Sequence, residues 1–288
     1  MTLRSYLYVP GNRPELFEKA LNSRADGVIF DLEDAVDSDE KKTALQHVVD
    51  CLSDGEVSST EPEIWVRVNN RPGLLEAELA AVGGLARLTG ISLPKVESVG
   101  VLSRIDEMLP DRVDVLSLIE SASGLTAVSE IAIHHRVHRL GLGEADLIAD
   151  LKMSPGPDRV ELMSSRVNLV VASAAAQIDK PVGPVFVDIG DEQSLERSSE
   201  QLRRLGFGGR SAVHPNQLEI INRVFTPSAL EVEKAEYLVR SVAEKAELGM
   251  ALFVDDQGKM VDEAVVRSAR HVIDVANSIQ RRERDTSG

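Results

Sequence analysis

Strand-like and helix-like segments alternate along the chain about eight times, and this repeat constrains the fold more than any other feature of the sequence. The strand-like segments are residues 5–10, 27–33, 63–69, 90–96, 113–120, 137–144, 182–189 and 209–215. A helix-like segment follows each of them, at residues 14–23, 39–52, 74–85, 99–109, 122–134, 160–177, 192–206 and 216–225. Eight such units are the number that closes a parallel barrel. An open doubly wound sheet usually stops at five or six strands and carries a glycine fingerprint, which VPGNRP (9–14) lacks. We therefore predict an α/β fold, a (β/α)8 TIM barrel formed by residues 1–226.

Two further helix-like segments follow the barrel, at about residues 228–249 and 262–282. A short loop joins them, and no linker of low complexity separates them from the preceding units. We therefore interpret residues 227–288 as a C-terminal helical arm of the barrel and not as an independent domain.

Composition narrows the class of partner. Only 3% of the residues are aromatic, so branched aliphatic side chains must fill the core, which suits parallel strands covered by helices. The net charge of −15 argues against nucleic acid as a partner, because phosphate binding needs a basic surface. Cys51 is the single cysteine, which excludes an internal disulfide and a thiolate metal site. No secretory signal and no membrane-spanning run is present, so we expect a cytoplasmic protein without a membrane partner.

The strand-like segments end in polar and charged side chains, which is the feature that points to a function. In a parallel barrel the C-terminal ends of the strands carry the catalytic groups, and a charge there is buried cheaply only if something pairs with it. The residues at these ends are Asp31, Glu33, Asp34, Arg67, Asn69, Lys95, Glu97, Glu120, Glu144, Asp146 and His214. We therefore predict that they converge on one acid-rich polar site.

An acid-rich site with few histidines suits a hard divalent cation. Mg²⁺ takes carboxylate oxygens and keeps several waters. Glu120 and Asp146 follow neighbouring strands and are the natural pair of metal ligands, and Glu33 and Asp34 could orient metal-bound waters. The alternative is that these acids only cap the helices that follow them.

Four cations near strand ends are candidates for binding an anionic substrate. Arg67 lies between apolar neighbours in a strand and needs an anionic partner, either a substrate carboxylate or, structurally, Asp31 or Glu33. Arg4 and Arg13 flank the first strand, where they could hold phosphate or simply be solvated. Lys95 follows the fourth strand, and we assign it to substrate binding.

Two further polar residues have structural explanations that compete with a functional one. Glu144 shares a short loop with Asp146, and one loop seldom places both acids on one ion, so it could serve as a helix cap instead. His214 precedes Pro215 and is expected to shape the turn or to line the mouth as a hydrogen bonder.

Eight short motifs, in order, resemble the citrate lyase β-subunit-like group of magnesium-dependent acyl-CoA lyases and aldolases, the wider family that includes malyl-CoA lyase. The resemblance covers about residues 3–275. Each motif is weak alone, and their order and their placement at strand ends make the set specific. The motifs are LRSYLYVPGNRP (3–14), IFDLEDAV (29–36), WVRVNN (65–70), SLPKVE (92–97), IESASG (119–124), GEADL (143–147), GRSAVHPNQ (209–217) and MVDEAVVRSAR (260–270).

The resemblance implies a β/α barrel that is usually a homotrimer, with Mg²⁺ held by Glu120 and Asp146. It implies that Arg67 binds the 2-oxo acid and that Glu33 and Asp34 support the metal waters. It also implies that Asp262, in the arm, reaches the site of a neighbouring subunit as a catalytic residue. From spacing alone Asp262 would be the N-cap of the last helix, and that alternative stays open.

The implied activity is cleavage of a 3-hydroxyacyl-CoA, such as citramalyl-, malyl- or citryl-CoA, to acetyl-CoA and a small 2-oxo acid. Two alternatives remain at this point. One is a malate synthase-like condensing enzyme or an acyl-CoA thioesterase that uses the same site. The other is an acyl-thioester-binding β subunit that acts within a citrate lyase complex.

Overall fold

The eight predicted strands close into a barrel. The structure is a computed structural model that describes residues 3–53, 61–247, 253–254 and 260–285. All eight barrel strands are parallel and pair in sequence order, and β1 closes the ring against β8. The strands are β1 (Ser5–Pro10), β2 (Gly27–Asp31), β3 (Glu63–Arg67), β4 (Gly90–Leu93), β5 (Asp114–Ile119), β6 (Val137–Leu142), β7 (Val182–Gly183) and β8 (Gly209–Ala212). The prediction of a TIM barrel is confirmed.

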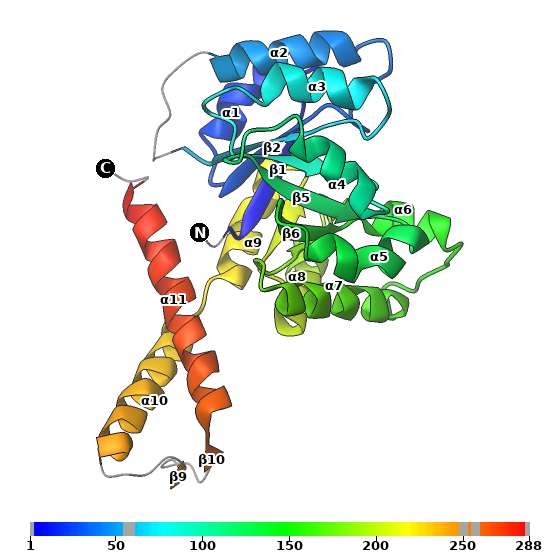
Figure 1. The fold of residues 1–288 in the computed structure, drawn as a ribbon. Coiled ribbons are helices and arrows are strands. Elements are labelled where there is room, and N and C mark those ends of the chain that lie inside the picture. The colour runs from blue at the N-terminus through cyan, green and yellow to red at the C-terminus, as the bar shows by residue number, and fades with distance from the viewer. Residues whose placement is uncertain (1–2, 54–60, 248–252, 255–259, 286–288) are drawn as a thin grey trace. The chain divides into compact units, whose positions relative to one another are not determined.

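Helices cover the outside of the barrel, one or more between each pair of strands (Figure 1). The α-helices are α1 (Phe17–Leu21), α2 (Lys41–Ser53), α3 (Leu74–Val82), α4 (Val99–Asp106), α5 (Ala122–Ala132), α6 (Glu144–Asp150), α7 (Met163–Ala176), α8 (Glu192–Leu205) and α9 (Leu218–Phe225). Short 3₁₀ turns, η1 (Pro14–Leu16), η2 (Val160–Leu162) and η3 (Pro215–Gln217), precede α1, α7 and α9. Among the described helices, none is long and apolar enough to cross a membrane.

The chain divides into two compact units, one of residues 3–225 and one that contains residues 226–288. The second unit contains two long helices that pack along each other, α10 (Ala229–Glu247) and α11 (Glu263–Asp285). A two-stranded antiparallel ribbon, β9 (Phe253–Val254) with β10 (Met260–Val261), lies between them in the sequence. The predicted C-terminal helices are therefore present.

The barrel interior combines large and small side chains from neighbouring strands. Tyr6, Ile29, Trp65, Leu116 and Leu118 form one buried cluster there, separate from the aliphatic core under the helices. Glycines on adjacent strands leave room for them. A Cβ atom on Gly90 would lie 2.4 Å from the Trp65 ring, and one on Gly141 would lie 2.5 Å from Leu118.

Strand β7 is much shorter than the sequence pattern predicts. We expected residues 182–189, but only Val182 and Gly183 are in strand conformation. The reason is Pro184, which has no backbone N–H to donate to a neighbouring strand. The link from β6 to β7 is reduced to one register pair, Gly141 with Val182.

The tight fit between Gly90 and Trp65 gives a first prediction. Gly90→Ala adds a methyl group where the ring of Trp65 and the carbonyl oxygen of Asp114 leave no space, so the free energy of unfolding should fall by about 1–3 kcal/mol. Urea denaturation measures this change. Gly84→Ala is the matched control, because its Cβ would meet nothing within 4 Å. Equal stability of the two variants would contradict the packing of the barrel interior.

Candidate active site

Three predicted site residues reach the mouth of the barrel, the C-terminal ends of its strands, for one geometric reason. Asp31, Arg67 and Glu120 each lie two residues after a side chain of the interior cluster, and side chains in a strand return to the same face every second residue. Because of this alternation, the side chains of these three charged residues also point into the barrel, closer to its mouth than the cluster does. The preceding interior residues are Ile29, Trp65 and Leu118.

Arg67 is held by carboxylates from the end of β2 and from the loop that follows it. Its Nε and Nη2 donate to the two carboxylate oxygens of Asp31 at 2.7 and 2.6 Å, a bidentate pair. Its Nη1 lies 3.1 Å from Glu33 Oε2 and 3.7 Å from Asp34 Oδ2. Burial alone would lower the pKa of Arg67, but the hydrogen bond and charge of Asp31 raise it above its usual value. The structural alternative for Arg67, a partner to Asp31 or Glu33, is thus observed, and its contact with substrate stays a prediction.

Asp31 also organises the loop that carries the other two acids. Its Oδ1 accepts from the backbone N–H of Glu33 at 2.8 Å, and its Oδ2 accepts from that of Ala35 at 3.2 Å. Glu33 is buried, whereas the side chain of Asp34 is 57% exposed. Both acids belong to the ion-pair network around Arg67 and Lys95, and they differ in exposure to solvent.

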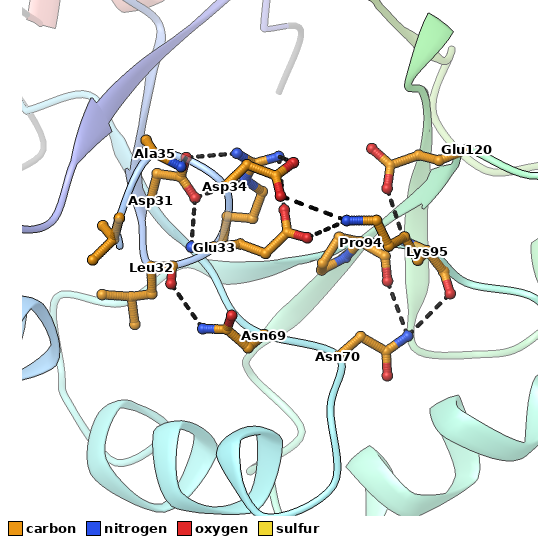
Figure 2. Close-up of polar contacts among 12 residues, drawn as sticks. Asp31, Leu32, Glu33, Asp34, Ala35, Asn69, Asn70, Pro94, Lys95 and Glu120 are labelled. Atoms are coloured by element: carbon orange, nitrogen blue, oxygen red, sulfur yellow. Dashed lines mark hydrogen bonds and ion pairs between the residues drawn. The ribbon is translucent and has the colours of Figure 1, made fainter. Parts of the chain in front are cut away.

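Lys95 joins this acidic loop to Glu120. Its ammonium pairs with Glu33 Oε1 and lies 3.6 Å from Asp34 Oδ1, and its backbone N–H donates to Glu120 Oε2 at 2.9 Å (Figure 2). Burial lowers the pKa of Lys95, but the hydrogen bond and charge of Glu33 outweigh this and raise it. Lys95 has a φ of 53°, the left-handed region that a side chain adopts only at a cost of about 1–3 kcal/mol. Contacts from neighbouring residues must therefore stabilise the turn after β4 that contains Lys95.

Glu120 is a buried acid of the mouth with a raised pKa. It is 5% exposed, and burial together with the charge of Glu33 and a smaller effect of Asp146 raises its pKa to about 7, against the opposing effects of Lys95 and Arg67. A Cβ atom on Gly143 would lie 2.4 Å from its Cγ and Oε1, so only glycine leaves room for this carboxylate. Asp146, in the first turn of α6, is half-buried.

The residues of the mouth fit a magnesium ion. Glu120 is buried without an arginine or lysine side chain bonded to its carboxylate among the described residues, whereas Glu33 is already paired with Arg67 and Lys95. The donor atoms are hard carboxylate oxygens, which Mg²⁺ prefers, and a cation among them would offset the cost of burying their charge. The residues that could hold the ion are Glu120 and Asp146, with Glu33 and Asp34 beside them.

Glu144 and His214 have structural partners. Glu144 is buried and pairs with Arg166 at 2.7 Å and with Arg159 at 2.9 Å, so ion pairing rather than helix capping explains it. His214 Nδ1 accepts from the backbone N–H of Asn216 at 3.2 Å and caps the 3₁₀ turn η3. The expectation that His214 shapes the turn is confirmed.

Arg4 does not lie at the mouth of the barrel. It precedes β1 and therefore lies at the opposite end of the barrel from the mouth, where it pairs with Asp26 through two side-chain hydrogen bonds of 2.9 Å. The prediction that Arg4 binds substrate is wrong, because Arg4 lies at the start of the first strand and not at the end that forms the mouth. Arg13 does follow β1, and its exposed guanidinium pairs with Glu15. Its role in substrate binding stays a prediction.

Asp262 lies in the second unit and is the N-cap of α11. Its Oδ1 accepts from the backbone N–H of Val265 at 3.0 Å, as spacing alone predicts. A catalytic role in a neighbouring subunit is compatible with this contact, because a capping carboxylate keeps its second oxygen. That role stays a prediction.

Three residues that support the mouth did not emerge from the strand-end rule. Lys41 Nζ donates to the carbonyl oxygens of Leu32, Glu33 and Val36 at 2.9, 2.8 and 3.2 Å, so it holds the acidic loop. Glu78 accepts hydrogen bonds from Asn69, and Asn70 donates to the backbone of the turn after β4. Glu78 had a detectable signal, because helical periodicity places it on the apolar face of α3. Lys41 looks like an ordinary charge on a solvated helix.

The sequence profile described as HpcH/HpaI aldolase/citrate lyase matches residues 4–215. The chain belongs to this family. The match covers most of the barrel and contains every strand of the mouth, so the resemblance found in the motifs is confirmed.

Named relatives in this family differ in activity. The citrate lyase subunit beta of Leuconostoc mesenteroides subsp. cremoris is 30% identical, with 96% of this chain and 93% of the relative covered. The (3S)-malyl-CoA thioesterase of Cereibacter sphaeroides is 34% identical, covering 96% and 95%. The mitochondrial citramalyl-CoA lyase of Rattus norvegicus is 27% identical, covering 96% and 87%. The chain is therefore related to lyases and to a thioesterase.

One solved structure that is similar to this chain contains bound ligands. The protein CitE of Mycobacterium tuberculosis, in complex with magnesium, acetoacetate and coenzyme A, is 26% identical and superposes with a TM-score of 0.80. The match covers 96% of this chain and 98% of that one. Magnesium and coenzyme A therefore occur together in a structural neighbour of nearly the same length.

The buried Glu78 gives a prediction about pH. Burial raises the pKa of Glu78 to about 7, while two hydrogen bonds from Asn69 oppose the shift. A carboxyl group with a raised folded-state pKa stabilises the fold below its unfolded pKa, and this contribution is lost as pH rises towards 7. The stability difference between wild type and Glu78→Gln should therefore shrink by about 2 kcal/mol from pH 5 to pH 8, measured by urea unfolding. Glu130→Gln, on the exposed face of α5, controls for the loss of one charge. A pH-independent difference would contradict the shifted pKa.

Proposed function

We propose that the protein is a Mg²⁺-dependent carbon–carbon lyase that cleaves a 3-hydroxyacyl-CoA of the citramalyl-, malyl- or citryl-CoA type to acetyl-CoA and a 2-oxo acid. The observation that carries this proposal is the convergence of Glu33, Arg67, Lys95 and Glu120 at one barrel mouth. Relatives named as citrate lyase subunit and citramalyl-CoA lyase support the reaction class. We expect the enzyme to act in the cytoplasm.

In this proposal Glu120 and Asp146 hold the magnesium ion, and Glu33 and Asp34 orient its waters. When bound, the ion supplies positive charge that polarises the oxygens of the 2-oxo acid or of its hydroxyacyl precursor. The magnesium in the CitE structure supports this assignment. Glu120 would gain a counter-ion that offsets its burial.

Arg67 is fixed before substrate arrives, because Asp31 holds it through two hydrogen bonds. A fixed guanidinium stabilises charge that develops on the oxo-acid oxygen without reorganising during the reaction. Lys95 would add a second positive charge beside the substrate, and Arg13 would contact the anionic part of the thioester.

Cleavage needs two proton transfers. A base takes the proton of the substrate hydroxyl, the carbon–carbon bond breaks, and its electron pair remains on the product as a thioester enolate. Asp262 would return a proton to the enolate carbon to give acetyl-CoA, and in the condensing direction it would remove that proton. We place Asp262 in this role from a neighbouring copy of the chain within a homotrimer, which makes the site complete only in the oligomer.

Two alternatives rest on named relatives. A condensing enzyme or thioesterase would use the same residues, and the relative named (3S)-malyl-CoA thioesterase favours the hydrolytic form. An acyl-thioester-binding subunit of a citrate lyase complex is the second, and the relatives named citrate lyase subunit beta favour it. Both would bind the same class of thioester.

One assay separates these functions. We expect the purified chain with Mg²⁺ to release acetyl-CoA and a 2-oxo acid from at least one thioester of a citramalyl-, malyl- and citryl-CoA panel. Chelator should abolish turnover, and Glu120→Ala should lower it by about 100-fold or more, because a main stabiliser of the transition state is lost. The products are separated by chromatography.

Each other outcome identifies an alternative. Release of free CoA indicates the thioesterase. Turnover that requires an acyl-carrier partner indicates the complex subunit. Full activity of Glu120→Ala would contradict the metal site itself.

The contribution of Asp262 is tested by subunit complementation. Asp262→Asn keeps a good N-cap, so loss of activity in this variant would not come from loss of the cap. We expect Asp262→Asn and Glu120→Ala each to be inactive and their co-expressed mixture to regain activity, at roughly a quarter of the sites if the chains mix randomly. Wild-type activity of Asp262→Asn, or a mixture that stays inactive, would contradict a site shared between subunits.

A further inference from the structure

Two consecutive asparagines follow β3, and their side chains extend to opposite neighbours. Asn69 reaches the loop after β2, and Asn70 reaches the turn after β4 (Figure 2). These two segments carry, respectively, the acids Glu33 and Asp34 and the cation Lys95. The asparagine pair, Asn69 with Asn70, therefore lies between the two halves of the candidate site.

The side chain of Asn69 is fixed by hydrogen bonds to the loop after β2 and to Glu78 of α3. Its Nδ2 donates to the carbonyl oxygen of Leu32 at 2.7 Å and to Glu78 Oε1 at 2.6 Å, and its backbone N–H donates to Glu78 Oε2 at 2.7 Å. Asn69 and Glu78 are each 2% exposed. Both N–H bonds of the carboxamide are thus used, and a buried acid from α3 fixes its orientation.

Asn70 spans the turn at Lys95. Its Nδ2 donates to the carbonyl oxygens of Pro94 at 2.9 Å and of Lys95 at 3.0 Å. These two carbonyl groups flank the φ of Lys95, which is 53° and therefore strained. A left-handed residue persists when its surroundings over-determine it, and the two hydrogen bonds of Asn70 do this here.

The turn at Lys95 matters because it positions two groups of the site at once. Its backbone N–H donates to Glu120 Oε2 at 2.9 Å, and its ammonium pairs with Glu33. If the turn relaxed to ordinary φ values, the N–H would rotate away from Glu120 and the ammonium away from Glu33. The proposed metal ligand would then lose the hydrogen bond that orients it.

We infer that the asparagine pair is a positioning device that sets the spacing between the acidic loop and the Lys95 turn, and that Asn70 orients Glu120 through the backbone of Lys95. Neither asparagine need touch substrate or metal. Groups that orient a metal ligand typically change metal affinity by 10–100-fold when they are removed. The effect on metal affinity rests on the proposed function, whereas the effect on the Lys95 turn does not.

The test compares Asn70→Ala with Asn222→Ala in the full chain. Asn222, in α9, also donates through Nδ2 to a backbone carbonyl oxygen, that of Arg24 at 2.7 Å, and Arg24 precedes β2 at the opposite end of the barrel. The first readout is the dissociation constant of Mn²⁺, measured by electron paramagnetic resonance. The second is hydrogen exchange of the peptide that contains the Lys95 N–H, measured without metal.

We expect Asn70→Ala to weaken Mn²⁺ binding about tenfold and to speed exchange at Lys95 about tenfold, with wild-type values for Asn222→Ala. Asn70→Gln, which keeps the carboxamide on a longer side chain, should recover part of both effects. Wild-type exchange at Lys95 in Asn70→Ala would overturn the inference. If exchange responds but the wild-type protein binds no Mn²⁺, the positioning of the turn stands and the proposed metal function fails.

Discussion

The ion pair between Arg67 and Asp31 is the interaction on which the rest of the mouth depends. Asp31 is 2% exposed, and a carboxylate buried to this extent is stable only if its charge is matched. Arg67 matches it through two hydrogen bonds and leaves Nη1 facing Glu33. Asp31 in turn accepts the backbone N–H groups that shape the acidic loop. Removing Arg67 would take away the counter-ion of the buried Asp31, and removing Asp31 would take away two hydrogen bonds that shape the loop.

The residues of the site are connected to one another by hydrogen bonds and do not act independently. Lys41 holds the carbonyl groups of the acidic loop from α2, and Asn69 holds the same loop from β3. Asn70 then holds the Lys95 turn, and Lys95 contacts Glu120. A change at any of these positions alters the relative placement of carboxylates that the proposed chemistry needs close together.

The charged ends of the apolar strands are what made part of the site predictable from sequence. Asp31, Arg67 and Glu120 were predicted because each is a charge at the C-terminal end of an apolar strand, and the period of two then explains why all three lie on the interior face. Arg4 was misassigned because a strand has two ends, and only the C-terminal end belongs to the mouth. The position of Arg4 before the apolar run of the first strand is visible in the sequence and excludes it from the mouth.

Other features depend on contacts that are distant in the sequence. The two arginines that pair with Glu144 lie 15 and 22 residues away, in a segment without a strand, and no local pattern connects them. Lys41 and Asn70 act through backbone carbonyl groups, which every residue has and which sequence therefore cannot distinguish. Family membership was accessible from eight short motifs, but the acyl group is not, because a preference for one methyl group is worth only about 1–3 kcal/mol in an apolar pocket.

The shortness of β7 bears on how the barrel opens. Most strands are joined to each neighbour by several paired residues, whereas β6 and β7 share one pair, Gly141 with Val182. Local opening costs least where the fewest backbone hydrogen bonds must break. The wall between β6 and β8 is therefore the seam of the barrel, and transient separation there would admit water beside β6 while the Asp31–Arg67 side stays closed. Opening at this wall would therefore reach Asp146, the proposed metal ligand that follows β6, and not the Asp31–Arg67 pair of β2 and β3.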